Sequence, residues 1–195
     1  MSKHIVIIDN YDSFTYNLYQ YFASIGNCSV YRNDETTLAE LKKREMTHLI
    51  ISPGPGRPED SKVSIEAAQF FKGKIPILGV CLGMQLMAYL SGGKIEKHPP
   101  VHGDTEKIFH TNTGIHSGMP QAFLAARYNS LCVTDIDETK LEITARGESG
   151  FIMGLRNIKN PLFEGVQYHP ESFLTENGSK ILKNFLKLNS IPYIK

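Results

Sequence analysis

The segment Gly79-Val80-Cys81-Leu82-Gly83 has the residue types and spacing of a site for nucleophilic catalysis. A cysteine between two glycines, at a sharp turn from a buried strand into a helix, is typical of a nucleophile elbow. A helix N-terminus favours the thiolate form of a cysteine there. The backbone N–H of Leu82 is free to bind a negatively charged oxygen. The alternative role for Cys81 is that of a small apolar core residue, which is the role we expect for Cys28 and Cys132.

The segment Gln167-Tyr168-His169-Pro170-Glu171-Ser172 offers the base that a thiol nucleophile needs. Residues i and i+2 of an extended chain point the same way, so His169 and Glu171 can lie side by side. Pro170 disfavours a helix at His169. Glu171 would then orient the imidazole and leave its other nitrogen for Cys81. Taken alone, this pair also fits a surface pair at a strand end, but together with the cysteine it predicts a Cys-His-Glu triad.

A glycine-rich segment, Ser52-Pro53-Gly54-Pro55-Gly56, follows another strand-like run. It matches neither the G-x-G-x-x-G fingerprint nor the P-loop, which requires Lys followed by Ser or Thr. The segment is either a plain turn or the source of a second oxyanion donor. Gly54 is the candidate donor, because a glycine lets the backbone approach a substrate closely.

The first half of the chain alternates strand-like and helix-like segments, which predicts a parallel sheet with helices on both faces. Ligands bind such sheets beyond the carboxyl ends of the strands. The segments that contain Asp12, Gly54 and Cys81 all follow strands and are therefore expected at one rim. Asp12 or Ser13 is the expected N-cap of the first helix. We predict strands at 4–8, 28–32, 48–52 and 75–80, and helices at 13–25, 37–45, 63–72 and 82–91.

The second half changes to strand-like runs joined by turn-rich loops, which indicates meanders or hairpins. No linker rich in Pro, Gly or Ser separates the halves, so we expect a single domain over 1–195. The predicted fold is a three-layer α/β architecture with a mainly parallel central sheet. The later predicted strands are 106–110, 122–128, 141–147, 151–156 and 163–169, and the last helix is 179–188.

Composition excludes several classes of protein. The 195 residues are 41% hydrophobic and 21% charged, as expected for a soluble globular protein. A formal net charge of +1 argues against a nucleic-acid partner, and no apolar run is long enough to cross a membrane. The N-terminus suits a first strand rather than a signal peptide, and three scattered cysteines favour the cytoplasm. No metal site is expected, because four histidines match no zinc-binding spacing; these are His98, His102, His110 and His116.

Six segments, taken in order, resemble the signature segments of class I glutamine amidotransferases. The resemblance is to the branch of the small subunits of anthranilate synthase and aminodeoxychorismate synthase, and it covers residues 4–188. The two motifs GVCLG and HPE are highly specific for the superfamily, and the first two segments narrow it to this branch. The segments are DNYDSFTYNL, ISPGPG, PILGVCLGMQ, VHGDT, ARYNSL and EGVQYHPES.

The resemblance implies a flavodoxin-like strand order and a role for each motif. Cys81, His169 and Glu171 would form the triad that attacks the side-chain amide of L-glutamine. The backbone at Gly54 and Leu82 would form the oxyanion hole. The remaining glutamine contacts would be Pro55, Gly56, Gln85, Ser130 and Leu131.

The resemblance also implies a partner. A chorismate-using large subunit would receive the ammonia and make anthranilate, for tryptophan biosynthesis, or aminodeoxychorismate, for folate biosynthesis. This chain would need no cofactor, and Mg would belong to the partner subunit. Three residues depart from common family patterns, and the third lies in a loop that could contact the partner: Met84, Asn129 and Asp104.

Two other functions remain open at this point. A freestanding cysteine hydrolase of γ-glutamyl amides would use the same triad without a partner. A flavodoxin-like binding module would use Ser13 and Thr15 after the first strand as a phosphate loop. That loop lacks the glycine needed for close backbone approach, and the module would leave the triad without a role.

Overall fold

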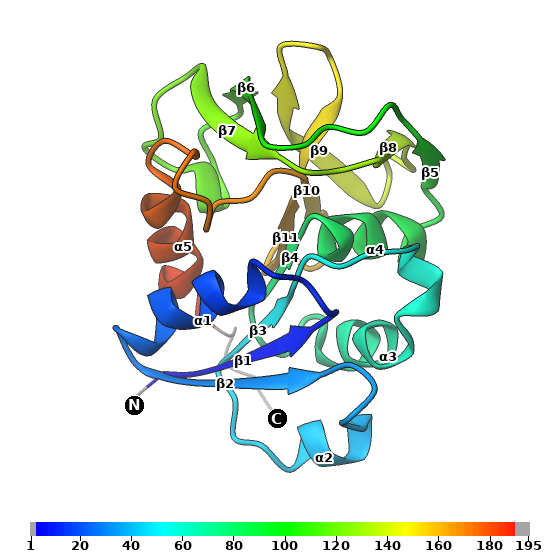
Figure 1. Ribbon diagram of the computed structural model, residues 1–195. Coiled ribbons are helices and arrows are strands. Elements are labelled where there is room, and N and C mark those ends of the chain that lie inside the picture. Colours follow the sequence, from blue (N-terminus) through cyan, green and yellow to red (C-terminus); the bar gives the residue numbers. More distant parts are fainter. Residues whose placement is uncertain (1–2, 190–195) are drawn as a thin grey trace.

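The computed structural model describes residues 3–189, which form a layered α/β structure (Figure 1). None of the helices in this range is long and apolar enough to cross a membrane. The strands are β1 (His4–Asp9), β2 (Asn27–Arg32), β3 (His48–Ile51), β4 (Ile77–Val80), β5 (Lys94–Lys97), β6 (Asp104–His110), β7 (Phe123–Arg127), β8 (Leu131–Asp135), β9 (Leu141–Gly147), β10 (Ile152–Asn157) and β11 (Phe163–Val166). The helices are α1 (Thr15–Ala23), α2 (Leu38–Lys42), α3 (Lys62–Phe71), α4 (Leu82–Leu90) and α5 (Gly178–Lys187), with short 3₁₀ turns at Pro58–Asp60 and Gly114–His116.

One large sheet carries both predicted halves of the chain. Its strand order is β2-β1-β3-β4-β11-β10-β9-β6-β7. The strands from β2 to β11 run parallel, and the pairs from β11 to β7 are antiparallel. The parallel part therefore has the flavodoxin-like order, and the predicted three-layer α/β fold is confirmed. The expected hairpins are also present, as the β6–β7 and β9–β10 pairs.

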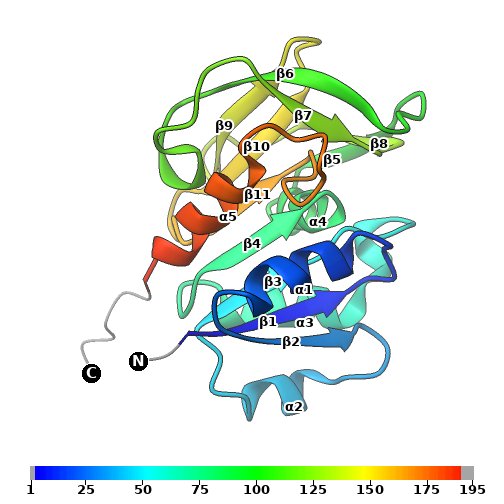
Figure 2. The same ribbon diagram turned by 60° about the vertical axis from the view of Figure 1, so that its left-hand side comes forward.

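Two apolar cores lie on opposite faces of the sheet, because alternate residues of each strand point to opposite faces. In β1, Ile5 and Ile7 belong to one core, and Val6 and Ile8 belong to the other. The first core packs α1 and α5 against the sheet, and the second packs α3 and α4. Figures 1 and 2 show these helix pairs on opposite sides of the parallel strands. Helices on both faces explain why β1, β3 and β4 are nearly continuous apolar runs.

The structure corrects some local predictions. Helix α1 is shorter than expected, and its N-cap is Phe14, which makes no side-chain capping bond. Asp12 instead accepts a hydrogen bond from the Phe14 N–H at 2.8 Å, within the loop that precedes the helix. The sequence analysis also missed β5 and β8, which pair antiparallel in a separate two-stranded sheet.

Candidate active site

Cys81 lies at the turn between β4 and α4, where the chain is bent sharply. Its φ of 52° and ψ of −100° are outside the regions that side-chain-bearing residues prefer. The flanking glycines allow the turn, because a Cβ on Gly79 would lie 2.4 Å from the carbonyl of Gly83. A Cβ on Gly83 would in turn lie 2.4 Å from the carbonyl oxygen of Ile51 in β3. The predicted elbow is therefore a close approach of α4 to the ends of two strands.

The strand pairing brings His169 to Cys81. β11 lies parallel to β4 with Val166 opposite Val80, and the Cys81 N–H donates to the Val166 carbonyl at 2.7 Å. His169 follows three residues after the end of β11. Its own N–H donates to the carbonyl of Ala126 in β7 at 3.0 Å, which fixes the backbone there. Neighbouring strands thus carry the predicted nucleophile and the predicted base.

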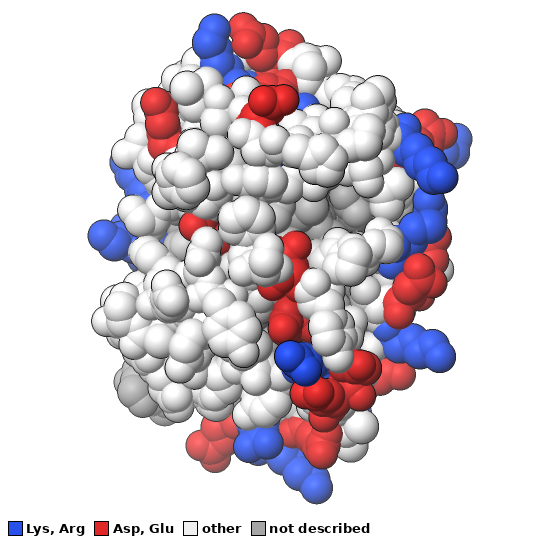
Figure 3. Space-filling view, in the orientation of Figure 1, with Lys and Arg blue, Asp and Glu red and all other residues white. Residues whose placement is uncertain are grey.

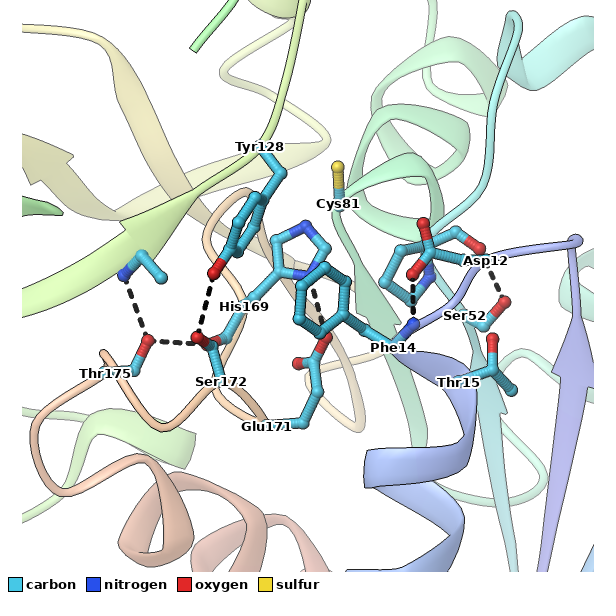
Figure 4. Close-up of polar contacts among 12 residues, drawn as sticks. Asp12, Phe14, Thr15, Ser52, Cys81, Tyr128, His169, Glu171, Ser172 and Thr175 are labelled. Carbon is cyan, nitrogen blue, oxygen red and sulfur yellow. Dashed lines mark hydrogen bonds and ion pairs between the residues drawn. The ribbon is translucent and has the colours of Figure 1, made fainter. Parts of the chain in front are cut away.

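His169 and Glu171 form a buried pair beside Cys81. The His169 Nδ1 and the Glu171 Oε1 are 2.7 Å apart, and both side chains are almost fully buried. Figure 4 shows the imidazole ring between the Glu171 carboxylate and the Cys81 side chain. The His169 Nε2 has no hydrogen-bond partner among the described residues. The arrangement leaves this nitrogen available to exchange a proton with the thiol.

The charge state of His169 follows from two opposing effects. Burial lowers the pKa of the imidazole, whereas the Glu171 carboxylate and Cys81 raise it. The carboxylate prevails, and the His169 pKa lies well above its ordinary value of 6.5. A protonated imidazole in this position can give a proton to a leaving group, as a general acid does.

Two aromatic rings hold the imidazole from its other sides. The ring centroids of Phe14 and Tyr128 lie 5.3 Å and 4.9 Å from that of His169, both edge-on. The Tyr128 hydroxyl also lies 3.2 Å from the Ser172 Oγ (Figure 4). The sequence analysis assigned no role to Phe14 or Tyr128. Both occur in motifs it quoted, so the signal was present, but their contact with His169 depends on three distant segments packing together.

A cavity of about 420 Å³ opens in front of Cys81. A volume of this size is suited to a small molecule. Leu82, His169 and Glu171 are not among the residues that line it. The lining contains six of the seven residues predicted to contact glutamine or its oxyanion: Gly54, Pro55, Gly56, Gln85, Ser130 and Leu131. It further includes Tyr11, Asp12, Ser13, Tyr128 and Asn129.

The Gly54 loop is held by a buried asparagine that the sequence analysis did not single out. The Asn10 N–H donates to the Ser52 Oγ at 2.8 Å, and the Asn10 Nδ2 donates to the Ser52 carbonyl at 3.1 Å. A Cβ on Gly54 would lie 2.5 Å from the Asn10 carbonyl oxygen and 2.9 Å from a methyl group of Leu82. The backbone of Gly54 therefore lies directly against Leu82. The two residues predicted to supply oxyanion donors are neighbours.

Gln85 presents an acceptor to the cavity. Its Nε2 donates both hydrogens, to the Leu131 carbonyl at 2.9 Å and to the Gln167 Oε1 at 3.0 Å. The Gln85 Oε1 makes no hydrogen bond among the described residues. An oxygen in this position suits the α-ammonium group of an amino acid, because that group has only donors to offer.

The three departures from the family patterns lie in different environments. Met84 is fully buried in the second core and does not line the cavity. Asn129 stabilises the cavity loop, since its Nδ2 donates to the Leu131 carbonyl at 3.0 Å and its Oδ1 accepts from Arg127. Asp104 is exposed at the start of β6. Asn129 is thus the departure that touches the candidate site.

Two of the four histidines between residues 98 and 116 lie close together in the structure. Between residues 3 and 189, the His, Cys, Asp and Glu side chains form no group of three that could bind a metal ion. His110 and His116 stack on each other with their ring centroids 5.2 Å apart. The His116 Nε2 forms a 2.8 Å hydrogen bond with the Tyr168 hydroxyl.

The elbow cysteine, the buried His-Glu pair and the adjoining cavity together form a candidate site for catalysis by a thiol nucleophile. A model of the family described as "Glutamine amidotransferase class-I" matches residues 6–188, and the chain belongs to this family. The resemblance found in the sequence is thereby confirmed, and the family match argues against the alternative of a flavodoxin-like binding module.

Named relatives of this chain come mainly from two kinds of synthase. The chain is 45% identical to "Anthranilate synthase component 2" of Pyropia yezoensis, over 94% of this chain and 98% of the relative. It is 47% identical to "Aminodeoxychorismate synthase component 2" of Klebsiella aerogenes, over 93% and 98%. It is also 48% identical to "Bifunctional protein TrpGD" of Thermotoga maritima, where 99% of this chain covers 33% of that longer protein. A crystal structure described as that of a GMP synthase component from Thermoplasma acidophilum has the same fold, with a TM-score of 0.83, 20% identity, and coverage of 95% and 93%.

Proposed function

We propose that this chain is the glutaminase subunit of a two-subunit synthase, which hydrolyses L-glutamine and delivers ammonia to a chorismate-using large subunit. The observation that carries the proposal is the cavity that joins the Cys81 thiol to a loop of glycines and to the Gln85 oxygen. Relatives of nearly the same length are named as component 2 of such synthases, which supports a partnered role.

The chemistry follows from the geometry of the triad. The Cys81 thiolate attacks the side-chain amide carbon of glutamine, and the carbonyl π electrons move onto the oxygen between Gly54 and Leu82. The His169 Nε2 gives its proton to the amide nitrogen, the C–N bond breaks, and ammonia leaves. Water then attacks the thioester, His169 takes its proton, and glutamate departs as the thiolate forms again.

Exposed aromatic side chains on the surface favour the interpretation that this chain binds a macromolecular partner. Phe173, two residues after Glu171, is 90% exposed, and Tyr11 and Tyr16 are also exposed. Figure 3 shows large uncharged areas on this face, with charged side chains mainly along the right-hand edge, the top and the base, and a run of acidic side chains that descends from the centre. We assign the docking rim for this partner to residues 9–13, 54–56 and 98–105. Any Mg requirement would belong to the partner.

We propose anthranilate as the preferred product, since several relatives are named for anthranilate synthase. Aminodeoxychorismate synthase, or service to both enzymes, is the alternative. The test measures glutamine hydrolysis by the chain alone and with each large subunit, with and without chorismate. We expect slow hydrolysis alone and a large rise with one partner. A rise with both partners identifies a shared subunit.

Cys81→Ser provides the matched control for this experiment. The variant should abolish glutamine-dependent synthesis and leave ammonia-dependent synthesis by the large subunit intact, because only the first half-reaction uses the thiol. A full rate for the wild-type chain alone, typically ~1–10³ per second, unchanged by either partner, would establish a freestanding γ-glutamyl hydrolase instead.

A further inference from the structure

A buried glutamine outside the predicted triad contacts the sulfur of Cys81. The Gln167 side chain is fully buried immediately after β11, and its Nε2 lies 3.3 Å from the Cys81 Sγ. Its backbone N–H donates to the Met153 carbonyl of β10 at 3.0 Å, so the residue is anchored in the sheet. The mechanism described above gives Gln167 no role.

The hydrogen-bond network determines which end of the Gln167 amide faces the sulfur. The Leu131 carbonyl can only accept, so the Gln85 atom beside it must be the nitrogen. That nitrogen also donates to Gln167, and the Gln167 atom there must be the oxygen. The Gln167 NH₂ group is therefore directed at the Cys81 Sγ. If the Gln167 amide were turned over, its NH₂ group would face the NH₂ group of Gln85, and two donors would meet.

We propose that Gln167 is a further catalytic residue, whose amide N–H donates to the Cys81 thiolate and holds it in position for attack. This inference rests on the proposed glutaminase chemistry. A hydrogen bond to a charged acceptor is roughly twice as strong as one to a neutral acceptor, and a neutral thiol accepts only weakly. The contact therefore stabilises the thiolate more than the thiol.

The same network joins the nucleophile to the cavity wall. Gln85 contributes its oxygen to the cavity and its nitrogen to Gln167, while Leu131 lines the cavity. A movement of the 128–131 loop would therefore shift the Gln85 and Gln167 side-chain amides and change the contact with the Cys81 sulfur. Gln167 thus links the position of the thiolate to the loop that encloses the substrate.

The direct test is the pH profile of Cys81 alkylation by iodoacetamide, measured on the isolated chain by mass spectrometry. Gln167→Met keeps the side-chain length and removes the donor. We expect its alkylation midpoint to move up by about one pH unit, which is a loss of about tenfold in labelling at a pH well below both midpoints. Gln167→Glu keeps the acceptor for Gln85 and puts a carboxyl group beside the sulfur, so its shift should be at least as large.

Asn184→Ala is the matched control, because Asn184 is another buried amide that holds two backbone carbonyls far from the cavity. It should lower stability without moving the alkylation midpoint. If Gln167 has a purely structural role, both Gln167 variants should also lose stability without a shift of the alkylation midpoint. That result would overturn the proposal. If one Gln167 variant fails to fold, the other still decides.

A kinetic experiment separates this proposal from the proposed function. With the large subunit bound, Gln167→Met should lower kcat by about tenfold or more and change KM little. If the wild-type complex hydrolyses no glutamine, the proposed function fails, but the alkylation profile still tests the contact between Gln167 and Cys81. An unshifted profile in an active complex overturns the Gln167 proposal alone.

Discussion

His169 and Glu171 lie in an environment that gives them unequal tasks. In the proposed mechanism the imidazole carries the proton that moves, whereas the carboxylate is buried and contacts the imidazole at Nδ1. The second carboxylate oxygen of Glu171 has no hydrogen-bond partner among the residues described. The imidazole is therefore the main partner of this carboxylate, and their interaction holds the ring in one orientation.

Removal of His169 should cost more activity than removal of Glu171. We expect His169→Ala to lower kcat for glutamine hydrolysis by about 10²-fold or more, since the proton transfer is lost. Glu171→Ala should cost less, because Phe14 and Tyr128 still hold the ring. Steady-state kinetics of the complex with the large subunit measure both effects.

The control for this pair is His110→Ala, which removes a histidine that lies outside the cavity lining. It should retain the wild-type rate. A wild-type rate for His169→Ala at saturating glutamine would refute the assignment of the base.

Residue types and spacing were sufficient to predict the triad, because a cysteine elbow and a His-x-Glu pair each have a chemical meaning at short range. The same reasoning did not identify the contacts that Gln167, Phe14 and Tyr128 make in the candidate site. Each of them acts through contacts between segments far apart along the chain, and a buried glutamine or aromatic ring has no local pattern that reveals its partner. These site assignments stay predictions until the variants are measured.

The loop after β3 packs so closely against its neighbours that a single methyl group at Gly54 should displace it. Gly54→Ala should push the loop away from Leu82, because the new Cβ would lie 2.5 Å from the Asn10 carbonyl. Loss of one oxyanion donor typically costs about 10²–10³-fold in kcat. We expect a loss in this range for glutamine-dependent synthesis, with ammonia-dependent synthesis preserved, and product assays with each nitrogen source measure it.

Gly26→Ala is the matched control for the loop variant. A Cβ on Gly26 would meet its nearest neighbour at 3.4 Å, which is an ordinary contact. This variant should keep the full glutamine-dependent rate. Equal rates for Gly54→Ala and wild type would show that the Gly54 loop does not bind the oxyanion.

The elements were predictable to the degree that their residues are buried in a regular pattern. β1, β3 and β4 are short apolar runs and were located within a few residues. β5 was missed because its four residues, KIEK, are mostly polar and exposed, and only pairing with β8 makes it a strand. The first turn of α1 was misplaced, because Asp12 bonds within the preceding loop instead of capping the helix.

The whole molecule contains buried titratable groups whose effects on stability oppose one another. Burial raises the pKa of Glu164 from 4.5 to about 7. The folded state then binds a proton that the unfolded state has lost, so this contribution to stability falls as pH rises from about 4.5 to 7. Burial lowers the pKa of His48 to about 4 and that of His116 to about 3. Their contributions are complete above 6.5 and are lost as pH falls below it.

Single substitutions should separate these opposing effects. Glu164→Gln keeps an acceptor for the Ile115 N–H and removes the cost of ionisation. We expect it to raise the free energy of unfolding at pH 8 by about 1–3 kcal/mol and to change it little at pH 4.5. His48→Gln should make the loss of stability between pH 6.5 and 4.5 shallower. Urea denaturation of the isolated chain across this range measures both, and parallel curves for wild type and variants would contradict the assignment.

The pairing of β4 with β11 has a consequence for the folding of the chain during its synthesis on the ribosome. Synthesis runs from the N-terminus, and 86 residues separate Cys81 from Gln167. The strands β1 to β4 emerge with the cysteine already in place, while β4 still lacks the neighbour that covers its edge. The proposed base, His169, reaches Cys81 only when β11 and the segment that follows have joined the sheet. We therefore expect that a chain whose translation stops early carries the proposed nucleophile without its proposed base and releases no ammonia.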